Sequence, residues 1–230
     1  MILSKRLALI ASLVEAGSRV CDVGTDHGYL PAFLYNSGKC ERVCATDIRE
    51  KPLQAARRNL EAAGARGVTL YLCDGLDSIT RDMADTVVIA GMGGEVISGI
   101  ISRASFLRDT TVTLILQPTT SADKLRDYLA NNGFVIANER AVSDNGKLYA
   151  VMKAHYCGIP YPISDVRRVT GLITPETDEG RAYVQKQYAV IKKRADDLEF
   201  TGKNNRVYLS SRAVEKELEK LLAREAHNGV

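Results

Sequence analysis

The sequence has no tryptophan, only three histidines and no Cys-x-x-Cys pair. A structural zinc site needs four cysteine or histidine ligands, usually closely spaced, so we predict no bound metal. The five cysteines are an odd number, and Cys21, Cys44 and Cys73 lie in apolar, strand-like runs. Free buried thiols are typical of a reducing compartment, which predicts a cytoplasmic protein without disulfides.

The sequence also lacks any apolar run near the roughly 18 residues that a membrane-spanning helix needs. Leu3, Leu7 and Ile10 recur at helical spacing among charged residues, which predicts an amphipathic helix rather than a signal peptide. We therefore expect no membrane partner. The net charge is only +3, so binding to a polyanion would require a local basic patch.

Strand-like and helix-like patterns alternate through the first two thirds of the chain. Helical patterns of about a dozen residues separate short β-branched runs, an order that predicts βαβ units and a mainly parallel sheet. The expected strands are Arg19–Val23, Arg42–Asp47, Val68–Cys73, Thr86–Ala90 and Thr111–Gln117. The expected helices are His27–Ser37, Glu50–Ala63, Glu95–Ser102 and Ser121–Asn131.

The pattern then changes to two consecutive strands, Phe134–Val142 and Lys147–Ala154, around Asn145-Gly146. Asn-Gly is a strong hairpin-turn signal, so we expect the sheet to end in an antiparallel hairpin. Five parallel strands closed by such a hairpin resemble the methyltransferase variant of the doubly wound fold. The fold class we predict is therefore α/β, a Rossmann-like methyltransferase sheet.

A glycine- and proline-rich segment, Tyr156–Ile163, predicts a domain boundary. It divides the chain into residues 1–157 and 163–230. The second part has apolar residues at coiled-coil spacing, which predicts an α-helical coiled-coil hairpin within one chain and, by default, a monomer. The spaced residues are Val184, Tyr188, Ile191, Ala195 and Leu198, then Val207, Val214, Leu218 and Leu221, with Gly202, Asn204 and Asn205 at the turn.

Glycines and carboxylates follow the first four strands at their carboxyl ends, where open α/β sheets bind ligands. Gly24 and Gly28 have the spacing of the outer glycines of GxGxG, with Asp26 in place of the middle one. Asp47 ends the second strand, where a carboxylate accepts hydrogen bonds from ribose hydroxyls or begins the next helix as its N-cap. Asp74-Gly75 suits an exocyclic amine and a flat ring, or a simple turn.

The fourth strand ends in Gly91-Met92-Gly93-Gly94. Exposed backbone amides there would grip a base or a phosphate, while the structural alternative is close packing of helix against strand. We take Met92, Gly93 and Gly94 as candidate substrate contacts and Gly91 as a candidate cofactor contact. The four features together, each at the carboxyl end of a strand, indicate a ligand-binding site much more specifically than any one of them alone.

Together with Leu3-Ser4-Lys5-Arg6-Leu7 and the loop Gly24-Thr25-Asp26-His27-Gly28-Tyr29-Leu30-Pro31, these motifs resemble the bacterial tRNA (adenine-22, N1)-methyltransferases over nearly the whole chain. The resemblance implies S-adenosylmethionine as methyl donor, S-adenosylhomocysteine as product, and tRNA as partner, methylated at N1 of an adenine in the D-arm region. It also implies cofactor contacts. Those to the methionine part are Gly24, Asp26, His27 and Gly28, those to the ribose Asp47 with its neighbour Ile48, and those to the adenine Asp74 and Gly75.

The sequence predicts no strong general base. Many base-amine methyltransferases carry Asn-Pro-Pro-Tyr after strand four, and this chain carries glycines there, which disfavours N6-methylation. N1 of adenine has a free lone pair, so positioning and desolvation are sufficient for its attack on the methyl group. Asp26 is our candidate for an assisting carboxylate, and Tyr29 either stacks on the target base or packs in the core.

The basic residues of the C-terminal part predict contacts with tRNA that offset the cost of turning the target base out of its stack. Arg167, Lys192 and Lys193 are our candidates, against the alternative of an ordinary solvated helix surface. Three other functions remain open from the residues alone. They are a methyltransferase for another RNA base or a small molecule, a non-catalytic nucleotide- or RNA-binding module, and a nicotinamide-dependent dehydrogenase, disfavoured by the terminal hairpin and missing glycine.

Overall fold

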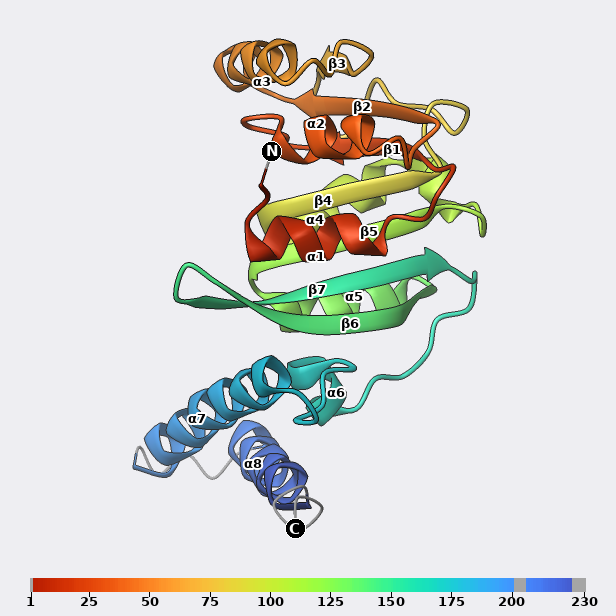
Figure 1. The fold of residues 1–230 in the computed structure, drawn as a ribbon. Helices are drawn as coiled ribbons and strands as arrows, with labels where there is room; N and C mark the ends of the chain where they lie inside the picture. The colour runs from red at the N-terminus through yellow and green to blue at the C-terminus, as the bar shows by residue number, and fades with distance from the viewer. Residues whose placement is uncertain (1, 201–205, 225–230) are drawn as a thin grey trace.

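The computed structural model describes residues 2–200 and 206–224, and its centre is a seven-stranded sheet (Figure 1). The strand order is β3-β2-β1-β4-β5-β7-β6. The first five strands pair in parallel, and the last two pair antiparallel with β5 and with each other. The bounds are β1 Arg19–Val23, β2 Arg42–Asp47, β3 Thr69–Leu72, β4 Thr86–Gly93, β5 Thr113–Thr120, β6 Phe134–Asp144 and β7 Lys147–Tyr156.

Helices cover both faces of this sheet because its central strands are apolar on both sides. Val87 and Ile89 of β4 pack with α4 and α5, whereas Val88 between them packs with α1 and α2. All three valine and isoleucine side chains are fully buried, as expected for a parallel sheet. The bounds are α1 Lys5–Leu13, α2 Tyr29–Asn36, α3 Glu50–Ala62, α4 Gly94–Arg103, a short 3-10 turn Ser105–Arg108, and α5 Ala122–Asn131.

Three helices follow the sheet: α6 Asp165–Thr170, α7 Asp178–Phe200 and α8 Arg206–Arg224. In Figure 1 they lie beyond the β6 edge of the sheet. Side chains of the expected seam, among them Val184 and Ile191 of α7 and Leu218 of α8, are buried. Val207, which was expected in the same seam, is 43% exposed. A helical pair is therefore present, its supercoiling remains a prediction, and the expected turn residues 202, 204 and 205 lie outside the described residues.

A buried arginine joins these helices to the sheet. Arg126 of α5 donates to Glu139 Oε1 of β6 from Nε (3.0 Å) and Nη2 (2.7 Å). Its Nη2 also donates to the Tyr183 hydroxyl of α7 at 2.9 Å, and its Nη1 donates to the carbonyls of Arg168 and Val169 in α6. Because the side chains of Arg126 and Glu139 are fully buried, this network requires the C-terminal helices to be in place.

Most expected elements begin or end within two residues of the observed ones, and the largest differences are at the carboxyl ends of β4 and β5, which each continue three residues further than expected. Helix α2 begins at Tyr29 rather than His27, because Gly28 precedes it in the left-handed region as its N-cap. Strand β4 continues through Gly93, with register shifts against β5 around Met92. No helix within the described ranges is long and apolar enough to span a bilayer.

Candidate cofactor and substrate site

The loop between β1 and α2 is a tight left-handed turn. Gly24, Asp26 and Gly28 have φ angles of 72°, 50° and 68°, a region that glycine and aspartate tolerate best. The amides of Gly24 and Thr25 both donate to the Thr46 carbonyl of β2, at 2.8 and 3.0 Å. A Cβ at Gly28 would lie 3.1 Å from Ala56 Cβ of α3. The turn is therefore held at both ends with its middle toward solvent.

This turn forms one wall of a pocket of about 280 Å³ at the carboxyl ends of β1 and β4. Its lining comprises Arg6, Leu7, Asp22, Gly24, Thr25, Asp26, His27, Tyr29, Leu30, Ala90 and Gly91. Burial raises the pKa of Asp22 to about 6, while a hydrogen bond from the Thr25 side chain and the nearby charge of Arg6 oppose that rise. Apart from this interaction with the Asp22 carboxyl, the buried Thr25 hydroxyl has no hydrogen-bond partner in the described part of the chain. A buried hydroxyl with so few protein partners favours a bound polar ligand.

Asp47 and two apolar side chains gather at the ends of β2 and β3. The Asp47 side chain is 6% exposed, and its Oδ1 accepts from the Arg49 amide at 2.9 Å. Among the described residues, no donor reaches Oδ2. Helix α3 has Arg49 as its N-cap, so Asp47 does not cap it. Ile48 and Leu72 are 62% and 56% exposed, and Leu72 pairs in register with Asp47. A carboxylate beside exposed apolar surface suits a nucleoside.

Asp74 and Gly75 follow β3 in a turn that packs against α4. The carboxylate of Asp74 lies 3.0 Å from Arg103 Nη2 and is half exposed. Gly75 has a φ of 59°, and a Cβ there would lie 3.0 Å from Ile100 Cγ2. Glycine at position 75 is therefore required by the turn and the core, whether or not a ring also lies nearby.

The glycines at the end of β4 and the start of α4 differ in exposure. Gly91, with φ 81°, is exposed and donates from its amide to Gln117 Oε1 at 3.1 Å. The Met92 side chain covers Gly24 so closely that a Cβ on Gly24 would collide with the end of the Met92 side chain. Gly94 is buried, and a Cβ on it would collide with the Ser121 carbonyl. The structural alternative of close packing therefore explains Gly94, and we no longer assign it to substrate.

Arg6 is a residue of this site to which the sequence analysis gave no role. Its Nη1 donates to Gln117 Oε1 at 2.6 Å, so one amide oxygen accepts from both Arg6 and the Gly91 backbone. Its guanidinium also lies 5.7 Å from the centre of the Tyr149 ring and 3.9 Å from Asp144. The family-like motif at the N-terminal end contained Arg6, but its main partner is 111 residues away, and no local pattern reveals such a contact.

Asp26, His27 and Tyr29 line the mouth of the pocket. The side chains of Asp26 and His27 are more than half exposed, with His27 Nε2 3.5 Å from Asp26 Oδ2. Tyr29 is 46% exposed, and its ring stacks on that of His27 with centroids 5.5 Å apart. Core packing is therefore not the role of Tyr29. Its ring remains available for a flat partner.

Three candidate substrate residues of the C-terminal helices lie apart from this pocket. Arg167 donates from Nη1 to the Gly171 carbonyl at 3.0 Å. Lys192 Nζ lies 3.4 Å from Glu215 Oε1 of α8. Lys193 is exposed on α7. None of the three is among the residues that line the 280 Å³ cavity.

The arrangement of fold and site defines a methyltransferase, and residues 3–152 match the family described as "Methyltransferase domain". More narrowly, the chain belongs to the bacterial tRNA (adenine-22, N1)-methyltransferase family. The tRNA (adenine(22)-N(1))-methyltransferase of Bacillus subtilis (strain 168) is 33% identical over 153 residues, which are 66% of this chain and 64% of that relative. The chain thus matches somewhat less than two thirds of that protein's length.

Two solved structures extend the similarity to the C-terminal helices. A Streptococcus pneumoniae protein, a candidate tRNA (m1A22) methyltransferase in complex with S-adenosyl-L-methionine, is 30% identical. The match covers 96% of this chain and 100% of that one, with a TM-score of 0.78. A Streptococcus agalactiae protein of the NADB-Rossmann superfamily is 27% identical and covers 96% of this chain and 98% of its own, with a TM-score of 0.82.

Proposed function

We propose that this protein transfers a methyl group from S-adenosylmethionine to N1 of adenine 22 in tRNA, leaving S-adenosylhomocysteine. The observation that carries the proposal is the row of ligand-binding features at the carboxyl ends of β1, β2 and β4, in a chain of the tRNA (adenine-22, N1)-methyltransferase family. These features open on one edge of the sheet, where a nucleoside and an amino acid group would lie end to end.

The residues present fit the proposed cofactor. Its amino acid part would lie along the Gly24–Gly28 turn, where the Thr25 hydroxyl has no partner among the described residues besides Asp22 and the Asp22 carboxyl faces the pocket. Asp47 would accept from the ribose hydroxyls through its free Oδ2, and Ile48 with Leu72 would contact the adenine ring. When bound, the cofactor supplies a methyl group on a positively charged sulfur.

The chain's own part in the reaction is to position and to desolvate the target adenine. The N1 lone pair attacks without prior loss of a proton, so no general base is needed, and the methylated ring carries a positive charge. In this proposal the Asp26 carboxylate accepts from the exocyclic amine and stabilises that charge, while Tyr29 stacks on the ring. The Gly91–Gly93 backbone is the opposite wall, held by Gln117 and Arg6.

The proposal includes a division of labour between residues 1–157 and 163–230. The first range holds every residue that lines the 280 Å³ pocket, and the second supplies exposed cations on α7. Turning adenine 22 out of its stack costs a few kcal/mol, which contacts from the second range would offset. A monomer working in the cytoplasm, where tRNA is found, completes the proposal.

The test is methyl transfer from labelled S-adenosylmethionine to unmodified tRNA transcripts, followed by nucleoside mass spectrometry. We expect 1-methyladenosine in a transcript with adenine 22 and none in a matched transcript with guanine 22. Equal methylation of both transcripts would move the proposal to another base. Tight cofactor binding without transfer to any tRNA would show a different acceptor or a non-catalytic module.

A further inference from the structure

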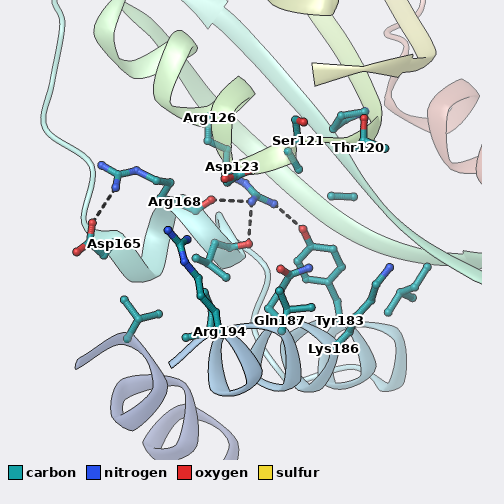
Figure 2. Close-up of a pocket in the computed structure, with 18 of the residues that line it drawn as sticks. Thr120, Ser121, Asp123, Arg126, Asp165, Arg168, Tyr183, Lys186, Gln187 and Arg194 are labelled. Carbon is teal, nitrogen blue, oxygen red and sulfur yellow. Dashed lines mark hydrogen bonds and ion pairs between the residues drawn. The ribbon is translucent and has the colours of Figure 1, made fainter. Parts of the chain in front are cut away.

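A second cavity, of about 380 Å³, lies between the sheet and the C-terminal helices (Figure 2). One wall is the end of β5 and the start of α5, with Thr120 and Ser121. The other wall is α7, with Lys186, Val190 and Arg194. We call this cavity the interdomain cleft. It is separate from the pocket beside the Gly24–Gly28 turn, with which it shares no lining residue.

The cleft presents two cations that no carboxylate among the described residues neutralises. Lys186, Val190 and Arg194 are spaced by four residues and therefore share one face of α7. Within residues 2–200 and 206–224, neither Lys186 nor Arg194 forms an ion pair. The other two cations that line the cleft are paired: Arg168 with Asp127 and Asp165, each at 2.8 Å, and Arg126 with Glu139.

The acidic side chains of the cleft do not cancel this charge. Asp165 is engaged by Arg168 and by the Ser210 hydroxyl, at 2.8 and 2.7 Å. Asp123 lies in the first turn of α5, the position where the helix dipole favours a carboxylate. Val190, 55% exposed between the two free cations, adds apolar surface. Two unpaired cations around an exposed valine suit a chain that carries phosphates and flat or sugar-like groups.

The cleft adjoins the edge where the target base must lie. In the β4–β5 ladder, Met92 pairs with Pro118 and Gly93 pairs with Thr120. Thr120 and Ser121 therefore run directly from the glycine-rich wall of the substrate site into the cleft. A polynucleotide strand that leaves the site along the end of β5 therefore enters the cavity that Lys186 and Arg194 line.

We propose that the interdomain cleft binds the phosphodiester backbone of the tRNA strand next to the target nucleotide, with Lys186 and Arg194 as its phosphate contacts. This inference rests on the proposed function and narrows the contact to two of the basic residues that the sequence offers in the C-terminal helices. Lys192 pairs with Glu215, Arg167 is turned toward Gly171, and Lys193 does not line the cleft. The cleft thus selects two of the many basic residues of the C-terminal helices.

The test compares two variants that remove equal charge from the full-length protein. One is Lys186→Gln with Arg194→Gln. The matched control is Lys216→Gln with Lys220→Gln, two exposed cations on α8 that line no part of the cleft and form no ion pair in the described ranges. The measurements are the Kd for tRNA across a salt series, the kcat at saturating tRNA, and the Kd for S-adenosylmethionine.

We expect the cleft variant to bind tRNA roughly tenfold more weakly at moderate salt, with the slope of log Kd against log salt reduced by about 2. Its kcat at saturation and its cofactor Kd should equal those of the wild type, because neither residue touches the reacting groups. An unchanged slope, or an equal loss in the control, would overturn the cleft as the binding site. Wild-type protein that binds no tRNA would instead overturn the proposed function itself.

Discussion

At the scale of single residues, the site depends on polar groups that the fold buries with few partners. Asp22 has the pKa of its carboxyl raised to about 6 by burial, and the Thr25 hydroxyl beside it has no partner among the described residues besides that carboxyl. Groups of this kind cost folding free energy and are retained where they serve a ligand. Both line the same pocket.

Replacement of Asp22 by Asn should stabilise the unliganded protein at pH 7.5. The folded carboxyl has a pKa near 6 instead of its ordinary 3.8, so the folded state binds the proton more tightly than the unfolded chain. Stability of the wild type therefore falls as pH rises from about 4 through 6, by up to about 3 kcal/mol. Urea unfolding of Asp22→Asn should show that gain at pH 7.5 and lose it toward pH 4.

The control for this prediction is Asp26→Asn, a change of the same chemistry on an exposed side chain of the same loop. Its stability difference from the wild type should be small and should not follow the pH 4 to 6 window. A gain in Asp22→Asn that is the same at every pH would mean that titration of this carboxyl is not the cause.

Replacement of Asp47 by Ala should weaken binding of S-adenosylmethionine by roughly 1–3 kcal/mol, which is the usual cost of removing one partner of a buried hydrogen bond. The reason is loss of the proposed acceptor for the ribose hydroxyls. Titration calorimetry would measure it, with Asp77→Ala as control because that carboxylate is exposed and near Arg103. Unchanged affinity in Asp47→Ala would remove the residue from the cofactor site.

At the scale of elements, the N-terminal helix α1 and strands β4 and β5 together close the pocket. Arg6 of α1 and the Gly91 amide of β4 donate to the same oxygen of Gln117 in β5. Gln117 is fully buried, and its own amide donates to the Pro118 carbonyl at 2.9 Å. One buried side chain thereby sets the position of a helix and of a glycine-rich wall.

The junction between the sheet and the C-terminal helices makes a second prediction at this scale. Arg126→Ala should destabilise the protein by about 3–5 kcal/mol, because it leaves the Glu139 carboxylate buried without its counter-charge. Guanidinium unfolding would measure the change. The double variant Arg126→Met with Glu139→Leu should recover a substantial part of the loss, since no unpaired charge then remains. A double variant as unstable as the single one would contradict this account.

The elements themselves could largely be predicted from the sequence, because burial and turn chemistry leave local signatures. The bounds of β1 and β2 match the expected ranges, and the Asn145-Gly146 hairpin is present. What could not be predicted depends on distant partners. The local sequence around Arg6 predicts a surface residue of an amphipathic helix, and that around Arg126 predicts an exposed helical cation. Only the fold places Gln117 beside Arg6 and Glu139 beside Arg126. Lys186 and Arg194 become distinguishable from Lys192 only when Lys192 is found to pair with Glu215 of α8.

At the scale of the whole molecule, the apolar seam of the C-terminal helices is used within one chain. Val184, Ile191 and Ala195 of α7 and Val214 and Leu218 of α8 are buried without a second copy. The protein should therefore be a monomer of 25.1 kDa in size-exclusion chromatography with light scattering, at all concentrations from micromolar upward. A mass near twice that value that falls on dilution would show a dimer, and the exposed Val207 and Leu209 would be the first residues to substitute.

The hydrogen bond between Arg6 and Gln117 also determines when the pocket can form during protein synthesis. At roughly 5–20 residues per second, the ribosome needs about 6 to 22 seconds to make the 111 residues that separate them. The strand that anchors the arginine of helix α1 is therefore made only at the end of that interval. The pocket is therefore completed late, and the cofactor cannot serve as an early template for folding. The nascent chain must form the sheet as far as β5 before the complete binding pocket exists.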